Sequence, residues 1–101
     1  MDRETVKISS KFASEVKSNY KGSEVYLFGS RASETNLVTS DFDFIVVSNE
    51  FDGVKLEQRI GKIQNLWNYS KDADIICLTE KEFNKKNSIL LRLASKKWVK
   101  L

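Results

Sequence analysis

Histidine and proline are absent from this chain of 101 residues, and cysteine occurs once, at Cys77. Without histidine and with a single thiol, a zinc site of the usual nitrogen and sulfur ligands is nearly excluded. Any metal would need oxygen ligands instead, which favours Mg²⁺ or Mn²⁺. Cys77 has no partner for an intramolecular disulfide, and its place in the apolar run 75–78 indicates a buried strand thiol.

Long hydrophobic runs are also missing, since no apolar stretch approaches the roughly 20 residues that span a bilayer. The first residues, Met1–Glu4, are polar and lack the apolar core of a signal peptide. We therefore expect a cytoplasmic protein without a membrane partner. Linkers, repeats and low-complexity tracts are absent too, so we expect one domain over residues 1–101.

The charge balance is only mildly basic, with a formal net charge of +3 at pH 7 and a pI near 9.0. Such a balance suits a polyphosphate or a nucleic acid, but many unrelated soluble domains share it. A nucleic-acid-binding domain would rest on net charge alone. We therefore do not expect nucleic acid as the partner.

The hydrophobic pattern predicts an α/β (α+β) fold, in which helices pack on a small mixed β-sheet. Runs of β-forming residues predict strands over residues 24–28, 42–47 and 73–78, and residues 98–101 fit a short edge strand. Apolar residues at helical spacing predict an opening helix over about residues 4–20 and a second helix before the third strand. The stripes are Ile8, Phe12, Val16 and Tyr20 in the first helix and Leu56, Ile60, Ile63 and Trp67 in the second.

Two aspartates, Asp41 and Asp43, stand two residues apart at the start of the second predicted strand. Because side chains alternate along a strand, both carboxylates project from one face, while Phe42 and Phe44 point into the helix-covered core. Two carboxylates that converge at a strand end are unfavourable unless a cation neutralises them, and two Mg²⁺ ions that also contact a triphosphate would do so. Other acidic pairs at this spacing occur in the chain, so spacing alone does not establish a metal site.

Gly29 and Ser30 follow the first predicted strand directly. A glycine there lets a phosphate approach the backbone without an intervening side chain, and Ser30 offers a hydroxyl and an amide at the start of a helical turn. An ordinary turn with a serine N-cap is the alternative interpretation.

A third acid, Asp74, stands between apolar neighbours in the third predicted strand. A carboxylate in that setting is expected to be paired, bound to metal or placed at an open sheet edge. If the third strand lies beside the second, Asp74 comes close to Asp41 and Asp43. Asp72 faces the same side and is the alternative, but it follows Lys71, before the strand begins.

Three segments together resemble the DNA polymerase beta-like nucleotidyltransferase superfamily, and in particular its stand-alone minimal nucleotidyltransferases. They are Leu27-Phe28-Gly29-Ser30-Arg31-Ala32, the run Ser40-Asp41-Phe42-Asp43-Phe44-Ile45-Val46, and Ala73-Asp74-Ile75. The resemblance covers nearly the whole chain, and the combination is far more specific than any single segment.

The resemblance implies roles for the same residues. Gly29 and Ser30 would hold the triphosphate, while Asp41 and Asp43 would ligate both metal ions. Asp74 would complete the metal site and help deprotonate the attacking hydroxyl. The implied reaction is in-line attack on the α-phosphorus of a nucleoside triphosphate, ATP in the first place, with pyrophosphate leaving. Arg31 would be either a further phosphate contact or a structural ion-pair partner.

The chain departs from the family pattern at three positions. Members commonly carry an arginine and a glycine after Gly-Ser-Arg-Ala and another arginine before Ser-Asp, where this chain has Ser33, Glu34 and Leu37. The loss of two cations and the gain of an acid should weaken nucleotide binding. The alternative function is therefore a catalytically weak or inactive domain that neutralises a partner by binding alone.

The resemblance also implies a partner, because larger relatives hold the acceptor with an extra helical domain for which this chain has no room. That partner is a helical protein of the HEPN (higher eukaryotes and prokaryotes nucleotide-binding) type. In such pairs the HEPN protein is an RNase toxin, and the transferase is the antitoxin that adenylylates a toxin tyrosine. Either a hetero-oligomer or a homo-oligomer fits this expectation.

The C-terminal third adds two sequence features. A capping box at Thr79–Glu82 predicts the start of another helix. Several large apolar residues then either cover the sheet or form part of a contact surface. They are Leu90, Leu91, Leu93, Trp98 and Leu101.

Overall fold

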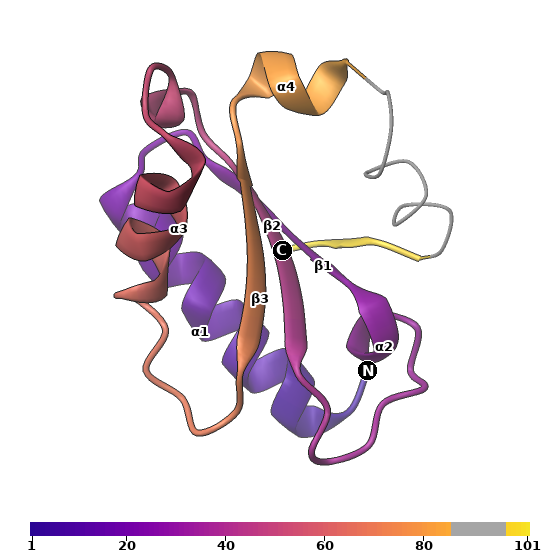
Figure 1. Ribbon diagram of the computed structural model, residues 1–101. Coiled ribbons are helices and arrows are strands. Elements are labelled where there is room, and N and C mark those ends of the chain that lie inside the picture. Colours follow the sequence, from indigo (N-terminus) through magenta and orange to yellow (C-terminus); the bar gives the residue numbers. More distant parts are fainter. Residues whose placement is uncertain (86–96) are drawn as a thin grey trace.

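A four-stranded mixed sheet forms the centre of the computed structural model, which describes residues 1–85 and 97–101 (Figure 1). The strands lie in the order β3-β2-β1-β4. β1 runs antiparallel to both β2 and β4, whereas β2 and β3 are parallel. Their bounds are Glu24–Phe28 (β1), Phe42–Val47 (β2), Ala73–Leu78 (β3) and Val99–Lys100 (β4).

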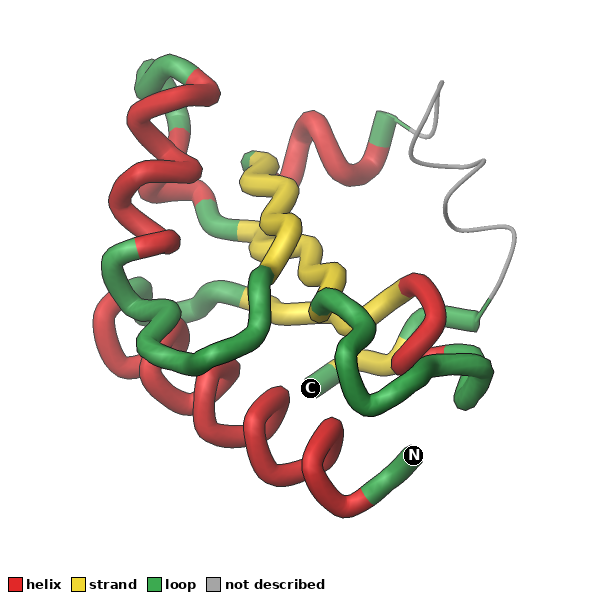
Figure 2. Tube along the Cα trace, turned by 60° about the horizontal axis from the view of Figure 1, so that its bottom comes forward, coloured by secondary structure: helices red, strands yellow, loops and turns green. Residues whose placement is uncertain are grey.

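Two longer helices cover one face of this sheet (Figure 2). They are α1 (Arg3–Asn19) and α3 (Leu56–Gln64), and the shorter helical segments are α2 (Gly29–Ala32), η1 (Asn49–Phe51) and α4 (Glu80–Asn84). The Asp2 side chain caps α1 by accepting a hydrogen bond from the Thr5 amide. Gly22, in the turn after α1, has a φ of +79°, which is the left-handed conformation expected of it.

Side chains of β2 divide between the two faces of the sheet. Phe42, Phe44 and Val46 are buried under α1 and α3, as the alternation predicts. Ile45 and Val47 point the other way and form a smaller cluster with Phe28. Asp43 belongs to this second face, near the end where the strand begins.

The predicted strands are confirmed over residues 24–28, 42–47 and 73–78, and β4 lies at the sheet edge. The predicted small mixed sheet with packed helices is therefore confirmed. The first apolar stripe is also confirmed, since Phe12 and Val16 are buried while Ile8 and Tyr20 pack against the core.

The second apolar stripe is partly wrong. Leu56 and Ile60 are 56% and 37% exposed, whereas Arg59 is only 6% exposed. The Arg59 guanidinium donates hydrogen bonds to backbone carbonyls and pairs with Glu82, so the helix turns this side toward the sheet. Ile63 is buried as predicted.

The capping box is confirmed, because the Thr79 hydroxyl accepts from the Glu82 amide and the Glu82 carboxylate accepts from the Thr79 amide. Trp98 and Leu101 pack against the two hydrophobic clusters. Leu90, Leu91 and Leu93 lie outside the described residues. Within the described ranges, no helix combines the length and apolar character needed to cross a membrane.

Candidate functional site

The strand register brings the predicted site residues to one end of the sheet. Asp43 is the Cα partner of Asp74 in the parallel pair β2–β3 and of Phe28 in the antiparallel pair β1–β2. Gly29, which follows Phe28, therefore lies next to Asp43. Asp41 stands just before β2 and two residues from Asp43. Segments that are distant in the sequence thus place three carboxylates and the Gly29-Ser30 turn together.

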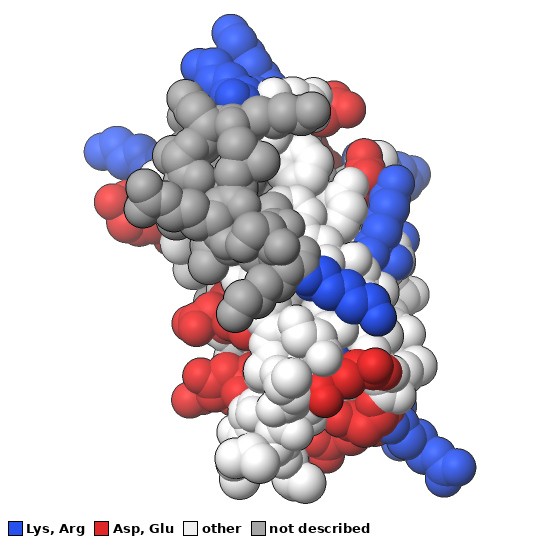
Figure 3. All heavy atoms as spheres, turned by 90° about the vertical axis from the view of Figure 1, so that its right-hand side faces the viewer, with Lys and Arg blue, Asp and Glu red and all other residues white. Residues whose placement is uncertain are grey.

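The three carboxylates differ in exposure. Asp43 is partly buried, whereas Asp41 and Asp74 are exposed. Acidic side chains gather at the same end of the molecule in the space-filling view, in the lower half where β2 and β3 begin (Figure 3). Asp43 is therefore the most enclosed of the three carboxylates.

Burial and neighbouring negative charges both disfavour the charged form of Asp43. Burial, followed by the charges of Asp74 and Asp41, raises the pKa of its carboxyl to about 6. Asp72 is not among these causes, and its backbone carbonyl accepts a hydrogen bond from the Phe42 amide before β3 begins. Of the two alternatives for the third carboxylate, the register favours Asp74.

The donor set fits Mg²⁺ or Mn²⁺, because it consists of carboxylate oxygens alone. Among residues 1–85 and 97–101, no three or more cysteine, aspartate or glutamate side chains are placed so that they could hold a metal ion by themselves. An open arrangement is what Mg²⁺ requires when substrate phosphates supply further ligands, since this ion is usually held by one or two carboxylates plus phosphate oxygens. The chemistry of these ligands therefore suits Mg²⁺ or Mn²⁺ that is also bound by phosphate oxygens.

Gly29 is required by its contact with Asp43. Its φ is +74°, and a Cβ atom on this residue would overlap Oδ2 of Asp43. Gly29 begins α2, and Ser30 lies in the first turn of this short helix. Phosphate binding by Gly29 and Ser30 stays a prediction, but only glycine leaves room for the Asp43 carboxylate here.

Arg31 is buried, with only 1% of its surface exposed. Its guanidinium donates hydrogen bonds to the backbone carbonyls of Ser40 and Val38 and to the Thr5 hydroxyl. It also lies 4.0 Å from the centre of the Phe42 ring. Of the two roles left open for Arg31, these contacts favour the structural one over phosphate binding.

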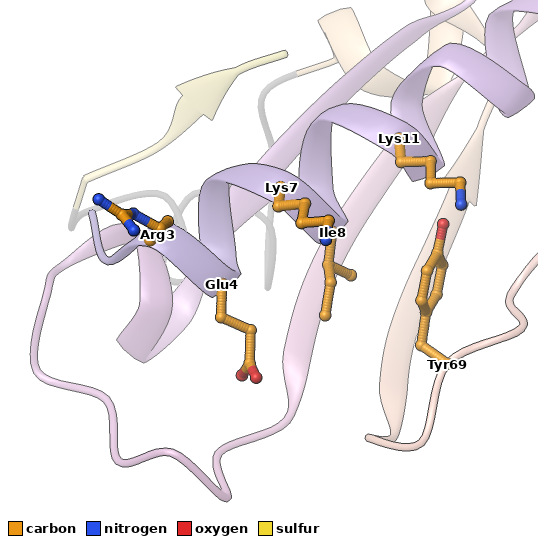
Figure 4. Close-up of a pocket in the computed structure, with 6 residues that line it drawn as sticks. All are labelled: Arg3, Glu4, Lys7, Ile8, Lys11 and Tyr69. Atoms are coloured by element: carbon orange, nitrogen blue, oxygen red, sulfur yellow. The ribbon is translucent and has the colours of Figure 1, made fainter.

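A hollow away from the three aspartates lies between α1 and the segment that carries Tyr69 (Figure 4). The Lys11 side chain points toward the Tyr69 hydroxyl across it. The residues that line it are Arg3, Glu4, Lys7, Ile8, Lys11 and Tyr69. Because α1 covers the opposite face of the sheet from Asp43, this hollow is not part of the carboxylate site.

The sequence model of the nucleotidyltransferase domain matches residues 9–99, which include every predicted site residue. The chain belongs to the nucleotidyltransferase domain family. We find no match among curated proteins.

Two crystal structures are similar to this nucleotidyltransferase domain. A candidate nucleotidyltransferase from Sulfolobus solfataricus has 28% identity and a TM-score of 0.68, with 95% of this chain and 86% of that chain covered. A second candidate nucleotidyltransferase has 21% identity and a TM-score of 0.60, with 99% of both chains covered, and it shows the shared fold. Family and fold together support nucleotidyl transfer as the general activity.

The departures from the family pattern lie in the loop between α2 and β2. Glu34 has a φ of +61°, a left-handed conformation that glycine adopts more readily than glutamate. Its carboxylate pairs with the amino group of Met1. Leu37 is 72% exposed. The loop of this nucleotidyltransferase domain therefore presents an acid and an apolar side chain at two of the three positions that depart from the pattern of the resemblance.

Proposed function

We propose that this domain transfers a nucleoside monophosphate from a nucleoside triphosphate to an acceptor hydroxyl in a metal-dependent reaction. The observation that carries the proposal is the register that pairs Asp43 with Asp74 beside Gly29. Asp41, two residues before Asp43, adds the third carboxylate. Three acids at one end of a sheet repel one another, which is unfavourable for stability. Such an arrangement is typical of a functional site.

Each residue has a role in the proposed reaction. Asp41, Asp43 and Asp74 would hold divalent cations, which when bound neutralise charge on the attacking and leaving oxygens. Gly29 leaves room for the Asp43 carboxylate beside the proposed triphosphate site, and Ser30 would donate to a phosphate oxygen. Asp74 accepts the proton of the acceptor hydroxyl. The new bond joins the hydroxyl oxygen to the α-phosphorus, and the bond to pyrophosphate breaks, so the protein contributes mainly by positioning the reactants.

The finer specificity rests on the resemblance to minimal nucleotidyltransferases. We propose ATP as the donor, Mg²⁺ or Mn²⁺ as the metal and a tyrosine of a helical HEPN toxin as the acceptor. In this role the domain is the cytoplasmic antitoxin of a toxin–antitoxin pair. The exposed and open position of Asp41 and Asp74 supports a large acceptor such as a protein surface.

Asp74 and Asp72 provide a matched pair for testing the proposal. The wild type, Asp74→Asn and Asp72→Asn are incubated with α-labelled ATP, Mg²⁺ and a HEPN-type protein as the proposed acceptor. We expect the label on the partner with the wild type and with Asp72→Asn, and a loss of at least about 100-fold with Asp74→Asn. If the label reaches no acceptor, or if Asp72→Asn is the impaired variant, the assignment is wrong.

A second candidate function is neutralisation of the partner by binding alone. It is favoured by the contacts of Arg31, whose donors are directed to protein groups, and by Ser33, Glu34 and Leu37 in place of cations and glycine. This function predicts that Asp41→Asn combined with Asp43→Asn leaves neutralisation in cells intact. A stably folded double variant that no longer protects cells would exclude it.

A further inference from the structure

We infer that Arg31 is a positioning residue that holds the backbone of Asp41 in place for metal binding. The inference rests on the proposed function, because it concerns the same carboxylates. Arg31 itself touches none of them. It contacts instead the residues on both sides of Asp41, namely the carbonyl of Ser40 and the ring of Phe42.

The contacts with Ser40 use two donors of the same guanidinium. Nε and Nη2 of Arg31 lie 3.1 and 2.9 Å from the Ser40 carbonyl oxygen, and Nη2 lies 3.0 Å from that of Val38. Hydrogen bonds from a charged donor are about twice as strong as neutral ones, and the planar guanidinium fixes their direction. The peptide unit that joins Ser40 to Asp41 is therefore held from one side, while the Phe42 ring lies under the guanidinium.

The other end of the guanidinium is attached to the first turn of α1. Nη1 lies 2.7 Å from the hydroxyl of Thr5, which is fully buried, and Nη2 lies 3.5 Å from the Glu4 carboxylate. Glu4 also pairs with Lys71 at 2.8 Å, shortly before β3 and Asp74. Helix α1 thus anchors the segment that leads to Asp41 directly and the segment that leads to Asp74 through a more exposed ion pair.

A role in local packing alone does not explain why the charged Arg31 side chain is buried. A buried charge is unfavourable unless it is hydrogen-bonded, and here the compensating carbonyls belong to the loop that leads into the metal site. Outer-sphere residues that orient metal ligands in this way affect affinity without contacting the ion. Displacement of the guanidinium should therefore displace Asp41.

The chain offers Arg59 as a matched control. Arg59 is also buried, donates to the carbonyls of Val54 and Cys77, pairs with Glu82 and lies near the Phe51 ring. These partners belong to the far end of the sheet, where β2 and β3 finish. Lysine in place of either arginine keeps the charge but loses the fork of donors.

The experiment measures Mn²⁺ binding by electron paramagnetic resonance in the presence of a nucleotide analogue, together with thermal unfolding. The variants are Arg31→Lys and Arg59→Lys. We expect both to lower the melting temperature, but only Arg31→Lys to weaken Mn²⁺ binding, by about tenfold or more. In a transfer assay the same variant should lower kcat while leaving KM for ATP within about twofold, because the defect lies in placing the ligands.

Equal Mn²⁺ affinity in the wild type and a folded Arg31→Lys variant would overturn the inference, as would equal weakening by Arg59→Lys. If Arg31→Lys does not fold, Thr5→Val replaces it, since it keeps the shape of the side chain and removes only the hydroxyl acceptor. Unchanged Mn²⁺ affinity in that variant would also overturn the inference. Absence of Mn²⁺ binding in the wild type is a different result, because it refutes the proposed metal site and the inference falls with it.

Discussion

Strands β2 and β3 carry two different chemistries on their two faces. On the face under α1 and α3, Phe42 and Phe44 are fully buried in the main hydrophobic cluster. On the other face, at the same end of the strands, Asp43 and Asp74 stand side by side. Because side chains alternate, one short segment forms the core and the site at once. The difference teaches that the face under the helices supplies the rigidity, while the exposed end of the other face, where β2 and β3 begin, carries the charges.

The two faces should respond in opposite ways to substitution. Loss of an apolar side chain under the helices should lower stability with an indirect effect on activity. Loss of a carboxylate from the open face should abolish activity while lowering repulsion. Gly29 links the core to the site, because it follows β1 directly and leaves room for the Asp43 carboxylate.

The largest effect on stability is expected for Phe44→Ala. The Phe44 ring is fully buried and lies 4.7 Å from that of Phe12 and 5.6 Å from that of Trp67, between centroids, so its removal leaves a cavity that the surroundings fill only in part. The free energy of unfolding should fall by about 3–5 kcal/mol. Urea denaturation of this variant and of Asp43→Asn measures the contrast. A loss below about 1 kcal/mol for Phe44→Ala would mean that the two faces are not as different as described.

An intermediate effect is expected for Gly29→Ala, for which Gly22→Ala is the matched control. Both glycines have positive φ, so alanine should cost about 1–2 kcal/mol at either position. Only at Gly29 would the added Cβ overlap the Asp43 carboxylate, whereas no atom lies within 4 Å of it at Gly22. Gly29→Ala should therefore be the less stable variant and should also lose Mn²⁺ binding. Equal stability and equal Mn²⁺ binding in the two variants would show that Gly29 does not shape the site.

The smallest effect is the pH dependence of stability. The pKa of Asp43 is raised to about 6 in the folded protein from an ordinary value of 3.8, so the folded state binds the proton more tightly than the unfolded state. The wild type should therefore lose stability relative to Asp43→Asn as pH rises from 4 to 6, and the difference should stay constant above that. About 1 kcal/mol is expected, because solvent screens a carboxylate that is only half buried.

Thermal unfolding of both proteins between pH 4 and 8, without divalent cations, measures this difference. Added Mg²⁺ should then stabilise the wild type and leave Asp43→Asn unchanged. A difference that grows as pH falls would contradict the repulsion between Asp43 and its acidic neighbours.

The bounds of β1, β2 and β3 could be predicted from sequence, because each is a short run rich in apolar residues, most of them β-branched or aromatic in β1 and β2. The register could not, since nothing local determines which strand lies beside β2. The sequence places Asp74 near Asp43 only if the third strand lies beside the second. The parallel β2–β3 pair in the structure meets this condition.

The roles of two arginines could not be predicted from sequence, because they depend on side-chain contacts that the sequence does not reveal. The inward face of α3 includes Arg59, whose guanidinium reaches backbone carbonyls, so a search for apolar spacing favoured Leu56 and Ile60 wrongly. Arg31 follows Gly29-Ser30, where a cation suits a phosphate as well as a protein partner. Its actual contacts are mainly main-chain oxygens in the following loop, and main-chain groups leave no signal in the choice of residue.

The most direct test is a crystal structure of the protein with Mn²⁺ and an ATP analogue that cannot be cleaved between the α- and β-phosphates. We predict anomalous scattering from Mn²⁺ at about 2.0–2.4 Å from carboxylate oxygens of Asp41, Asp43 and Asp74, with phosphate oxygens as further ligands. Mn²⁺ held by other side chains, or by Asp72 with Asp74 turned away, would contradict this assignment.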